Sequence, residues 1–132
     1  MADFLIAWSI TGPNEGGFVN DPADPGGYTY RGITRKNFPK WPGWGAVEAA
    51  NPHTGQILPE LEPIVEQLYK KNFWDPIKGD FIIDQNIANI TFDMAVNKGL
   101  VVAIEGLQDS VGIEPTGVMD SYTLQAVNNP TI

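Results

Sequence analysis

Residues 14–34 constrain the fold of this chain more than any other part of the sequence. These 21 residues include five glycines and two prolines, together with Glu15, Asp21 and Asp24. Glycine supplies positive φ angles, and proline fixes φ and removes a backbone donor, so the stretch must turn and cannot form a long helix or strand. We therefore expect Glu15, at the head of the stretch, to be held in place by backbone geometry, with room for a small hairpin between about residues 20 and 34.

Apolar periodicity predicts helices around this stretch. A short helix is expected over residues 4–11, ending at Gly12-Pro13 because the residue before a proline avoids the α region. Residues 37–58 are expected to be mostly loop, with one helical turn near 46–50. The remaining pattern predicts helices over about 61–73, 83–98 and 101–111, and a last one that begins with Asp120 as N-cap. The chain is thus expected to be mainly α, with a small β-hairpin or irregular loop after Glu15.

Composition excludes several functional classes. The chain has 132 residues, which is enough for one domain with one core, and no cysteine, which excludes disulfides and a cysteine nucleophile. A net charge of −8 argues against a nucleic-acid partner. No apolar run is long enough to span a membrane, so no membrane insertion is expected. The N-terminal apolar run lacks the basic flank of a signal peptide, and we expect synthesis in the cytoplasm without one.

Glu15 is the first candidate for chemistry. A carboxyl group beside apolar walls is disfavoured in its charged form and can act as a general acid near neutral pH. Asp21 and Asp24 each precede a proline, as turn-forming aspartates often do. A glutamate followed by an aspartate is nevertheless what glycoside hydrolysis requires. The alternatives, a solvated loop glutamate and two structural aspartates, stay open, and no metal or cofactor is expected because the calcium-loop spacing is missing.

Other candidates could contact a ligand. In the 83–98 helix, Asn97 falls on the apolar stripe formed by Ile83, Ile87, Ile90 and Met94. A buried amide must be hydrogen-bonded, so Asn97 either pairs with a backbone carbonyl or faces a substrate, with Asp93 one turn earlier in support. Trp41 and Trp44 lie in an expected loop and could stack on sugar rings, although a core position is the alternative. Tyr30 completes the set of candidate substrate-binding residues.

The run from Glu15 to Gly27, continued by Thr29 and Gly32-Ile33-Thr34, closely resembles the signature of glycoside hydrolase family 108, the phage-type N-acetylmuramidases also called secretion activators. Two later blocks, 72–77 and 92–99, look like that family's, and 103–124 is similar to its peptidoglycan-binding region. The resemblance implies a lysozyme-like fold in which a core over 1–98 carries a helical region over 99–132. It departs at Thr116 and Asp120, and the chain ends before the family's C-terminal helical region.

The resemblance also implies an activity, the hydrolysis of the β-1,4 bond between N-acetylmuramic acid and N-acetylglucosamine. Glu15 falls on the family's essential glutamate, Asp24 takes the second catalytic position, and Thr29 falls on the motif's threonine. Asn97 matches the amide on the helix under the cleft of lysozyme-like folds. A lytic transglycosylase with a single catalytic acid and a non-catalytic cell-wall-binding or delivery module stay open as alternatives.

The expected partner is the peptidoglycan glycan strand, bound by a monomer that acts in the periplasm or cell wall. Without an export signal, the protein would be released by a phage holin or carried by a secretion apparatus. If it serves as an antibacterial effector, an immunity protein would accompany it.

Overall fold

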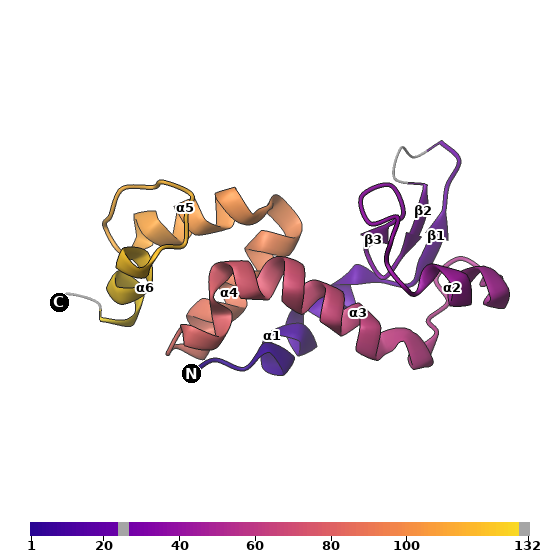
Figure 1. The fold of residues 1–132 in the computed structure, drawn as a ribbon, viewed down its shortest axis with the longest axis horizontal. Helices are drawn as coiled ribbons and strands as arrows, with labels where there is room; N and C mark the ends of the chain where they lie inside the picture. Colours follow the sequence, from indigo (N-terminus) through magenta and orange to yellow (C-terminus); the bar gives the residue numbers. More distant parts are fainter. Residues whose placement is uncertain (24–26, 130–132) are drawn as a thin grey trace. The chain divides into compact units, whose positions relative to one another are not determined.

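A computed structural model describes residues 1–23 and 27–129 of the chain (Figure 1). The chain forms two compact units. One comprises residues 12–68, and the other combines residues 1–11 with the chain from Tyr69 onward. Each unit is considered by itself below, and the expected division into a core over 1–98 and a region over 99–132 stays a prediction.

The unit of residues 12–68 contains a small antiparallel sheet with the strand order β1-β2-β3. Its strands are β1 (Phe18–Asn20), β2 (Tyr28–Tyr30) and β3 (Ile33–Thr34). The register pairs Phe18 with Tyr30, and Tyr30 with Ile33, so only Arg31 and Gly32 connect β2 to β3. The small hairpin expected after Glu15 is therefore present.

Aromatic rings fill the core of this unit. The ring of Trp41 stacks on that of Tyr30 and meets the ring of Trp44 edge-on. Both indoles are buried and satisfied, because Trp41 Nε1 donates to the Ile64 carbonyl over 3.3 Å and Trp44 Nε1 donates to the Phe38 carbonyl over 2.7 Å. Trp44 begins the helix α2 (Trp44–Ala50), which extends the single turn expected near 46–50.

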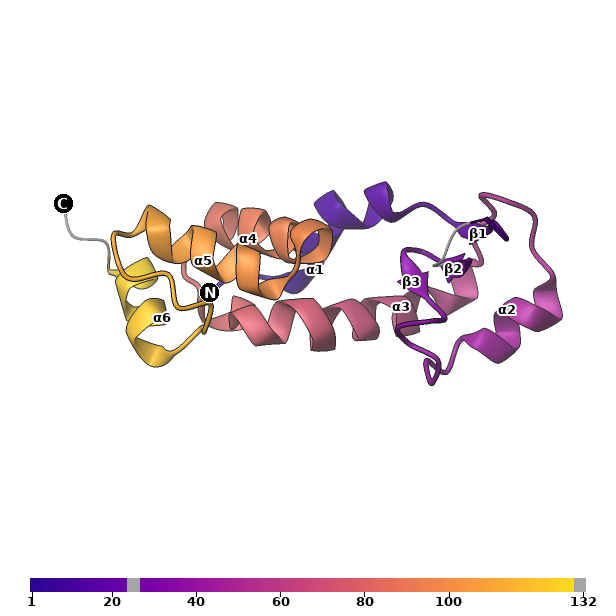
Figure 2. The ribbon, with the colours of Figure 1, turned by 90° about the horizontal axis from the view of Figure 1, so that it is seen from above.

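The second unit is helical. It contains α1 (Phe4–Thr11), α4 (Gln85–Lys98), α5 (Leu100–Ser110) and α6 (Ser121–Asn128), with α1 and α5 packing against α4 (Figures 1 and 2). The last residue of helix α3 (Glu62–Tyr69) is the first residue of this part of the unit, and the helix continues as a π-helical turn, Lys70–Trp74. Short 3₁₀ turns at Asp75–Ile77 and Gly79–Phe81 lead to α4. The rings of Phe4, Trp74 and Phe92 meet edge-on in its core.

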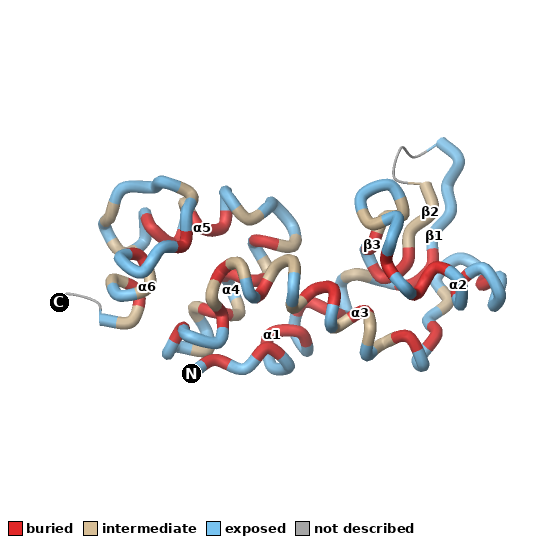
Figure 3. The backbone as a smooth tube through the Cα atoms, in the orientation of Figure 1, coloured by how far each residue is buried: buried red, intermediate tan, exposed pale blue. Residues whose placement is uncertain are grey.

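The buried face of α4 is not the one that the sequence predicted. Its core side chains are Ala88, Thr91, Phe92 and Ala95, whereas Ile90 is 67% exposed and Met94 is 40% exposed. Figure 3 shows the alternation of buried and exposed stretches along α4. The helix is apolar on two sides, and the side with small residues allows close packing against its neighbours. The expected stripe of large aliphatic residues was therefore the wrong choice of core face.

Residues that begin or end helices predicted the structure more reliably than the apolar pattern of α4 did. The helix α1 ends at Thr11, directly before Gly12-Pro13, and Asp120 caps α6 by accepting a hydrogen bond from the Thr123 amide over 2.8 Å. The buried amide of Gln108 on α5 orders the loop before α6, because it donates to Thr123 Oγ1 over 2.9 Å and accepts from the Gly117 amide over 3.0 Å. Across the described ranges, no helix combines the length and the apolar character that crossing a membrane requires.

Candidate active site

Glu15 is the last residue of a 3₁₀ turn, Gly12–Glu15, that follows α1 directly. The turn forms here because Pro13 cannot continue an α-helix, while its fixed φ suits the first turn of a tighter one. The side chain of Glu15 is half-buried. The glutamate that the sequence singled out is thus placed by a short, sharply turned segment, as expected.

The two glycines after Glu15 are required for different reasons. Gly16 adopts a φ of +66°, which glycine reaches at little cost. At Gly17, an added Cβ would lie only 2.5 Å from the Gly55 carbonyl oxygen and 2.6 Å from that of Gln56. Backbone hydrogen bonds fix this close approach, from the Phe18 amide to the Gln56 carbonyl over 3.0 Å and from the Gly55 amide to the Phe18 carbonyl over 2.8 Å.

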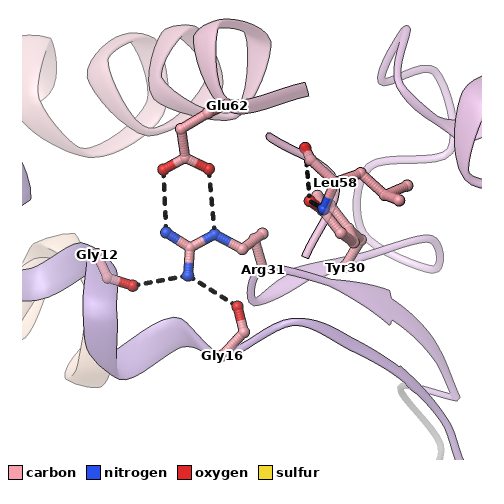
Figure 4. Close-up of polar contacts among 6 residues, drawn as sticks. All are labelled: Gly12, Gly16, Tyr30, Arg31, Leu58 and Glu62. Atoms are coloured by element: carbon pink, nitrogen blue, oxygen red, sulfur yellow. Dashed lines mark hydrogen bonds and ion pairs between the residues drawn. The ribbon is translucent and has the colours of Figure 1, made fainter. Parts of the chain in front are cut away.

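Arg31 holds the segment around Glu15 from the other side (Figure 4). Its Nη1 donates to the carbonyl oxygens of Gly12, over 3.0 Å, and Gly16, over 2.8 Å. The other edge of the guanidinium group pairs with Glu62, the first residue of α3, through Nε over 3.3 Å and Nη2 over 3.0 Å. The side chain of Arg31 is 7% exposed and that of Glu62 is 30% exposed, so the guanidinium group is buried while its carboxylate partner reaches water. We call Arg31, Glu62 and the two glycine carbonyls the arginine clamp.

The backbone of Arg31 is unusual too. Arg31 and Gly32 both have positive φ, +51° and +78°, as the central residues of a two-residue hairpin turn of type I′ require. Asparagine, aspartate and glycine are the usual residues there, because a longer side chain pays a steric cost of about 1 kcal/mol in this region. The sequence reasoning missed the clamp, and the only available signal was the turn-forming pair Arg31-Gly32.

Tyr30 is a core residue. Its side chain is fully buried, and its hydroxyl accepts from the Leu58 amide over 2.7 Å and donates to the Leu58 carbonyl over 3.2 Å (Figure 4). Burial raises the pKa of this phenol. The structure therefore corrects the expected placement of Tyr30, Trp41 and Trp44 at a surface where a sugar could reach them.

Three other candidate residues follow Glu15 closely in the sequence, namely Thr29, Asp21 and Asp24. Thr29 is half-buried at the centre of β2, paired with Val19 and Thr34 on the neighbouring strands. Asp21 caps its own turn by accepting a hydrogen bond from the Ala23 amide over 2.9 Å, as a turn-forming aspartate does. Asp24 lies outside the described residues, and its catalytic role stays a prediction.

The helical unit carries a groove of about 550 Å³ along α1 and α4, which we call the α1–α4 groove. Its lining residues are Ile10, Asn86, Asn89, Ile90, Asp93, Met94, Asn97 and Lys98. Its floor is apolar, and carboxamide, carboxylate and ammonium groups stand along it. The exposed faces of Ile90 and Met94, expected to be core, belong to this groove.

Asn97 and Asp93 both line the groove, although Asn97 is exposed and the expectation that it is buried was wrong. Its Nδ2 donates to the Asp93 carbonyl over 2.9 Å, which is the backbone-pairing alternative stated above. The Asp93 carboxylate accepts a hydrogen bond from Thr11 Oγ1 over 2.9 Å and so ties α4 to the end of α1. The hydrogen bond from Asn97 Nδ2 to the Asp93 carbonyl also sets the orientation of the Asn97 carboxamide oxygen.

Glu66, like Glu15 and Glu62, is a half-buried acid in the unit of residues 12–68. Burial on α3 raises the pKa of its carboxyl group, and repulsion by Glu62 adds to the shift. Apolar periodicity gave no sign of this residue. It is not among the partners of Arg31 in the arginine clamp, which makes it a suitable control residue for Glu15.

The family model for glycosyl hydrolase 108 matches residues 9–99, a range that includes Glu15, the sheet, the arginine clamp and α4. The chain belongs to glycosyl hydrolase family 108. It is also similar to a solved structure of SagA from Brucella abortus, with a TM-score of 0.70 and 30% sequence identity over 97% of this chain and 70% of that one. No curated protein matches the chain. The expected mainly α, lysozyme-like fold is confirmed, and membership in the family makes the chain a glycoside hydrolase by descent.

Proposed function

We propose that this family 108 protein is a peptidoglycan hydrolase that cleaves the β-1,4 bond between N-acetylmuramic acid and N-acetylglucosamine, with Glu15 as the general acid. The observation that carries the proposal is the setting of Glu15 inside the family match. Its backbone is fixed by the Gly17 contact on one side and by the arginine clamp on the other. An acid that transfers a proton to one particular oxygen needs such a fixed position.

In the proposed reaction, the Glu15 carboxyl group donates its proton to the bridging glycosidic oxygen as the bond from that oxygen to the sugar C1 breaks. Positive charge then develops at C1, a water oxygen bonds to C1, and that water passes one proton to a carboxylate base or to solvent, from which Glu15 is reprotonated. We assign the support of this charge or of this water to Asp24, and the orientation of the water to Thr29. Both assignments derive from the family motif, and the half-buried position of Thr29 on β2 is compatible with its role.

We propose the α1–α4 groove as a binding surface for the glycan strand. N-acetylated sugars present apolar ring faces and methyl groups beside amide donors and acceptors. The groove offers the complementary surface, an apolar floor from Ile10, Ile90 and Met94 with Asn97 and Asp93 along it. Pockets that bind such ligands typically combine apolar walls with a few polar groups that set orientation.

The proposed place of action is the periplasm or cell wall, after release by a holin or a secretion apparatus. A net charge of −8 supplies no long-range attraction toward an anionic wall. We therefore expect binding to depend on short-range contacts and to tolerate moderate salt.

Murein zymography with wild-type protein and Glu15→Gln tests this proposal, combined with mass spectrometry of the released muropeptides in ¹⁸O-labelled water. The proposal expects clearing by the wild type, loss of clearing by a folded Glu15→Gln variant, and one ¹⁸O atom at each new reducing end. Products with 1,6-anhydro ends and no ¹⁸O would instead establish a lytic transglycosylase. Co-sedimentation with sacculi without any released sugar would establish a binding module.

A further inference from the structure

We infer that Arg31 is a positioning residue for catalysis, which fixes the peptide segment carrying Glu15 through hydrogen bonds to the Gly12 and Gly16 carbonyls. The inference rests on the proposed role of Glu15 and extends it to a residue that is not assigned any role by the family match. Arg31 acts through Glu15 and its backbone, so it is not itself a catalytic residue.

The geometry of the arginine clamp brackets the glutamate. The Gly12 carbonyl belongs to the first residue of the 3₁₀ turn, and the Gly16 carbonyl belongs to the residue just after Glu15. Both bonds come from one nitrogen, so they fix the two carbonyls relative to each other as well as to the sheet. The peptide units between them, which set the direction of the Glu15 side chain, have little freedom left.

Glu62 fixes the guanidinium group in turn. The two carboxylate oxygens of Glu62 accept hydrogen bonds from Nε and Nη2 of Arg31, and Nη1 then points toward the glycine carbonyls (Figure 4). A planar fork with several donors can satisfy a carboxylate and two carbonyls at once, whereas a lysine ammonium group acts as a single point charge on a flexible stem. The arrangement therefore needs arginine, and a positive charge alone would not reproduce it.

Stability alone is a poor explanation for this residue. Buried ion pairs contribute little net stability after desolvation. Arg31 also adopts a left-handed backbone conformation, which glycine or asparagine would adopt at that turn with less strain. Strained backbone at a buried charge is typical of functional positions. The two features together indicate selection for where the guanidinium group lies.

Arg31→Lys is the first test, measured as kcat and KM on soluble glycan strands. Because a displacement of about 1 Å in a catalytic group costs on the order of 100-fold, we expect kcat to fall by about 10- to 100-fold with KM within about twofold of wild type. Arg35→Lys is the matched control, since Arg35 lies near the same hairpin and packs over the rings of Tyr28 and Trp44, but its side chain is 41% exposed. It should keep the wild-type kcat.

Chemical rescue separates positioning from folding. In Arg31→Ala, added guanidinium at low millimolar concentration should restore part of the lost kcat, whereas ammonium at the same ionic strength should not. If Arg31→Ala does not fold, Glu62→Gln provides the second variant, and it should lower kcat while leaving KM unchanged because it releases the guanidinium group. A wild-type kcat in folded Arg31→Lys, or equal rescue by ammonium, would overturn the inference.

Glu15→Gln in the same assay distinguishes the two proposals. If it is inactive while Arg31→Lys is fully active, only the positioning role fails. If folded Glu15→Gln turns over at the wild-type rate, the proposed function itself fails.

Discussion

Replacing Gly17 with alanine should destabilise the unit around Glu15 strongly, although the change adds a single methyl group. The new Cβ would lie 2.5 Å from the Gly55 carbonyl oxygen and 2.6 Å from the Gln56 oxygen, both backbone atoms. An ordinary carbon–oxygen contact is about 3.3 Å, so this loop would have to withdraw by roughly 0.8 Å.

That withdrawal breaks hydrogen bonds that hold the loop. The bonds between the Phe18 amide and the Gln56 carbonyl, and between the Gly55 amide and the Phe18 carbonyl, are 3.0 and 2.8 Å long and would stretch past useful length. Overpacking costs about 1–3 kcal/mol, and each lost backbone bond costs about 1 kcal/mol. We therefore expect Gly17→Ala to lower the free energy of unfolding by about 3 kcal/mol.

Two matched alanine substitutions calibrate this value. Gly16→Ala meets no atom within 4 Å but must adopt a φ of +66°, so it should cost only about 1 kcal/mol. Gly45→Ala lies inside α2 with open space around its Cβ position and should stabilise the fold by about 0.5–1 kcal/mol.

Urea unfolding followed by circular dichroism measures all three. With a slope of about 1.5 kcal/mol/M, Gly17→Ala should move the midpoint down by about 2 M, well beyond the shift for Gly16→Ala. Equal midpoints for Gly17→Ala and wild type would refute the reasoning, because the loop could not then lie against Gly17.

Three further predictions concern single side chains. Tyr30→Phe leaves the buried amide and carbonyl of Leu58 without their partner, so urea unfolding should show a loss of about 1–3 kcal/mol. Because burial raises the pKa of Glu66 in the folded state, its charged form costs stability above the ordinary glutamate pKa. Glu66→Gln should then raise Tm near neutral pH, with no gain at a pH below that value, and a gain independent of pH would contradict this. If the α1–α4 groove binds glycan, steady-state kinetics of Asn97→Ala should show KM raised by about 3- to 10-fold with little change in kcat. An unchanged KM would show that the groove does not bind glycan through Asn97.

Local signals in the sequence predicted the helix ends well. The proline at position 13 ended α1 at Thr11, and Asp120 began α6, because each effect depends on a few neighbouring residues. The hairpin after Glu15 followed from glycine content in the same way. The Glu15 turn was predictable for this reason, whereas the close approach of the Gly55 and Gln56 carbonyls to Gly17 is a finding of the structure.

Which face of a helix is buried depends on the elements that pack against it, and the face predicted from the sequence of α4 was wrong. The large side chains Ile90 and Met94 defined the expected stripe, but α4 buries the small residues and Phe92 instead. Asn97 lies on the same side of α4 as these residues and is therefore exposed. The same lack of tertiary information left two places open for Trp41, a sugar-stacking position and the core, and the structure uses it to fill the core of the sheet unit.

The arginine clamp could not be predicted at all from spacing. Arg31 and Glu62 are 31 residues apart, on a hairpin turn and at a helix start. No local pattern connects them, and a charged residue at a turn is ordinarily read as solvated. Only the packed fold shows that the guanidinium group also reaches the backbone on both sides of Glu15.

The turnover number of Glu15→Gln on defined glycan strands tests the central claim most directly, with Glu66→Gln as the matched control in the same unit. General acid catalysis contributes about 10²- to 10⁴-fold, so kcat should fall by at least about 100-fold in folded Glu15→Gln and stay within about twofold of wild type in Glu66→Gln. A folded Glu15→Gln variant that keeps the wild-type kcat, or a loss found only in Glu66→Gln, would contradict the account.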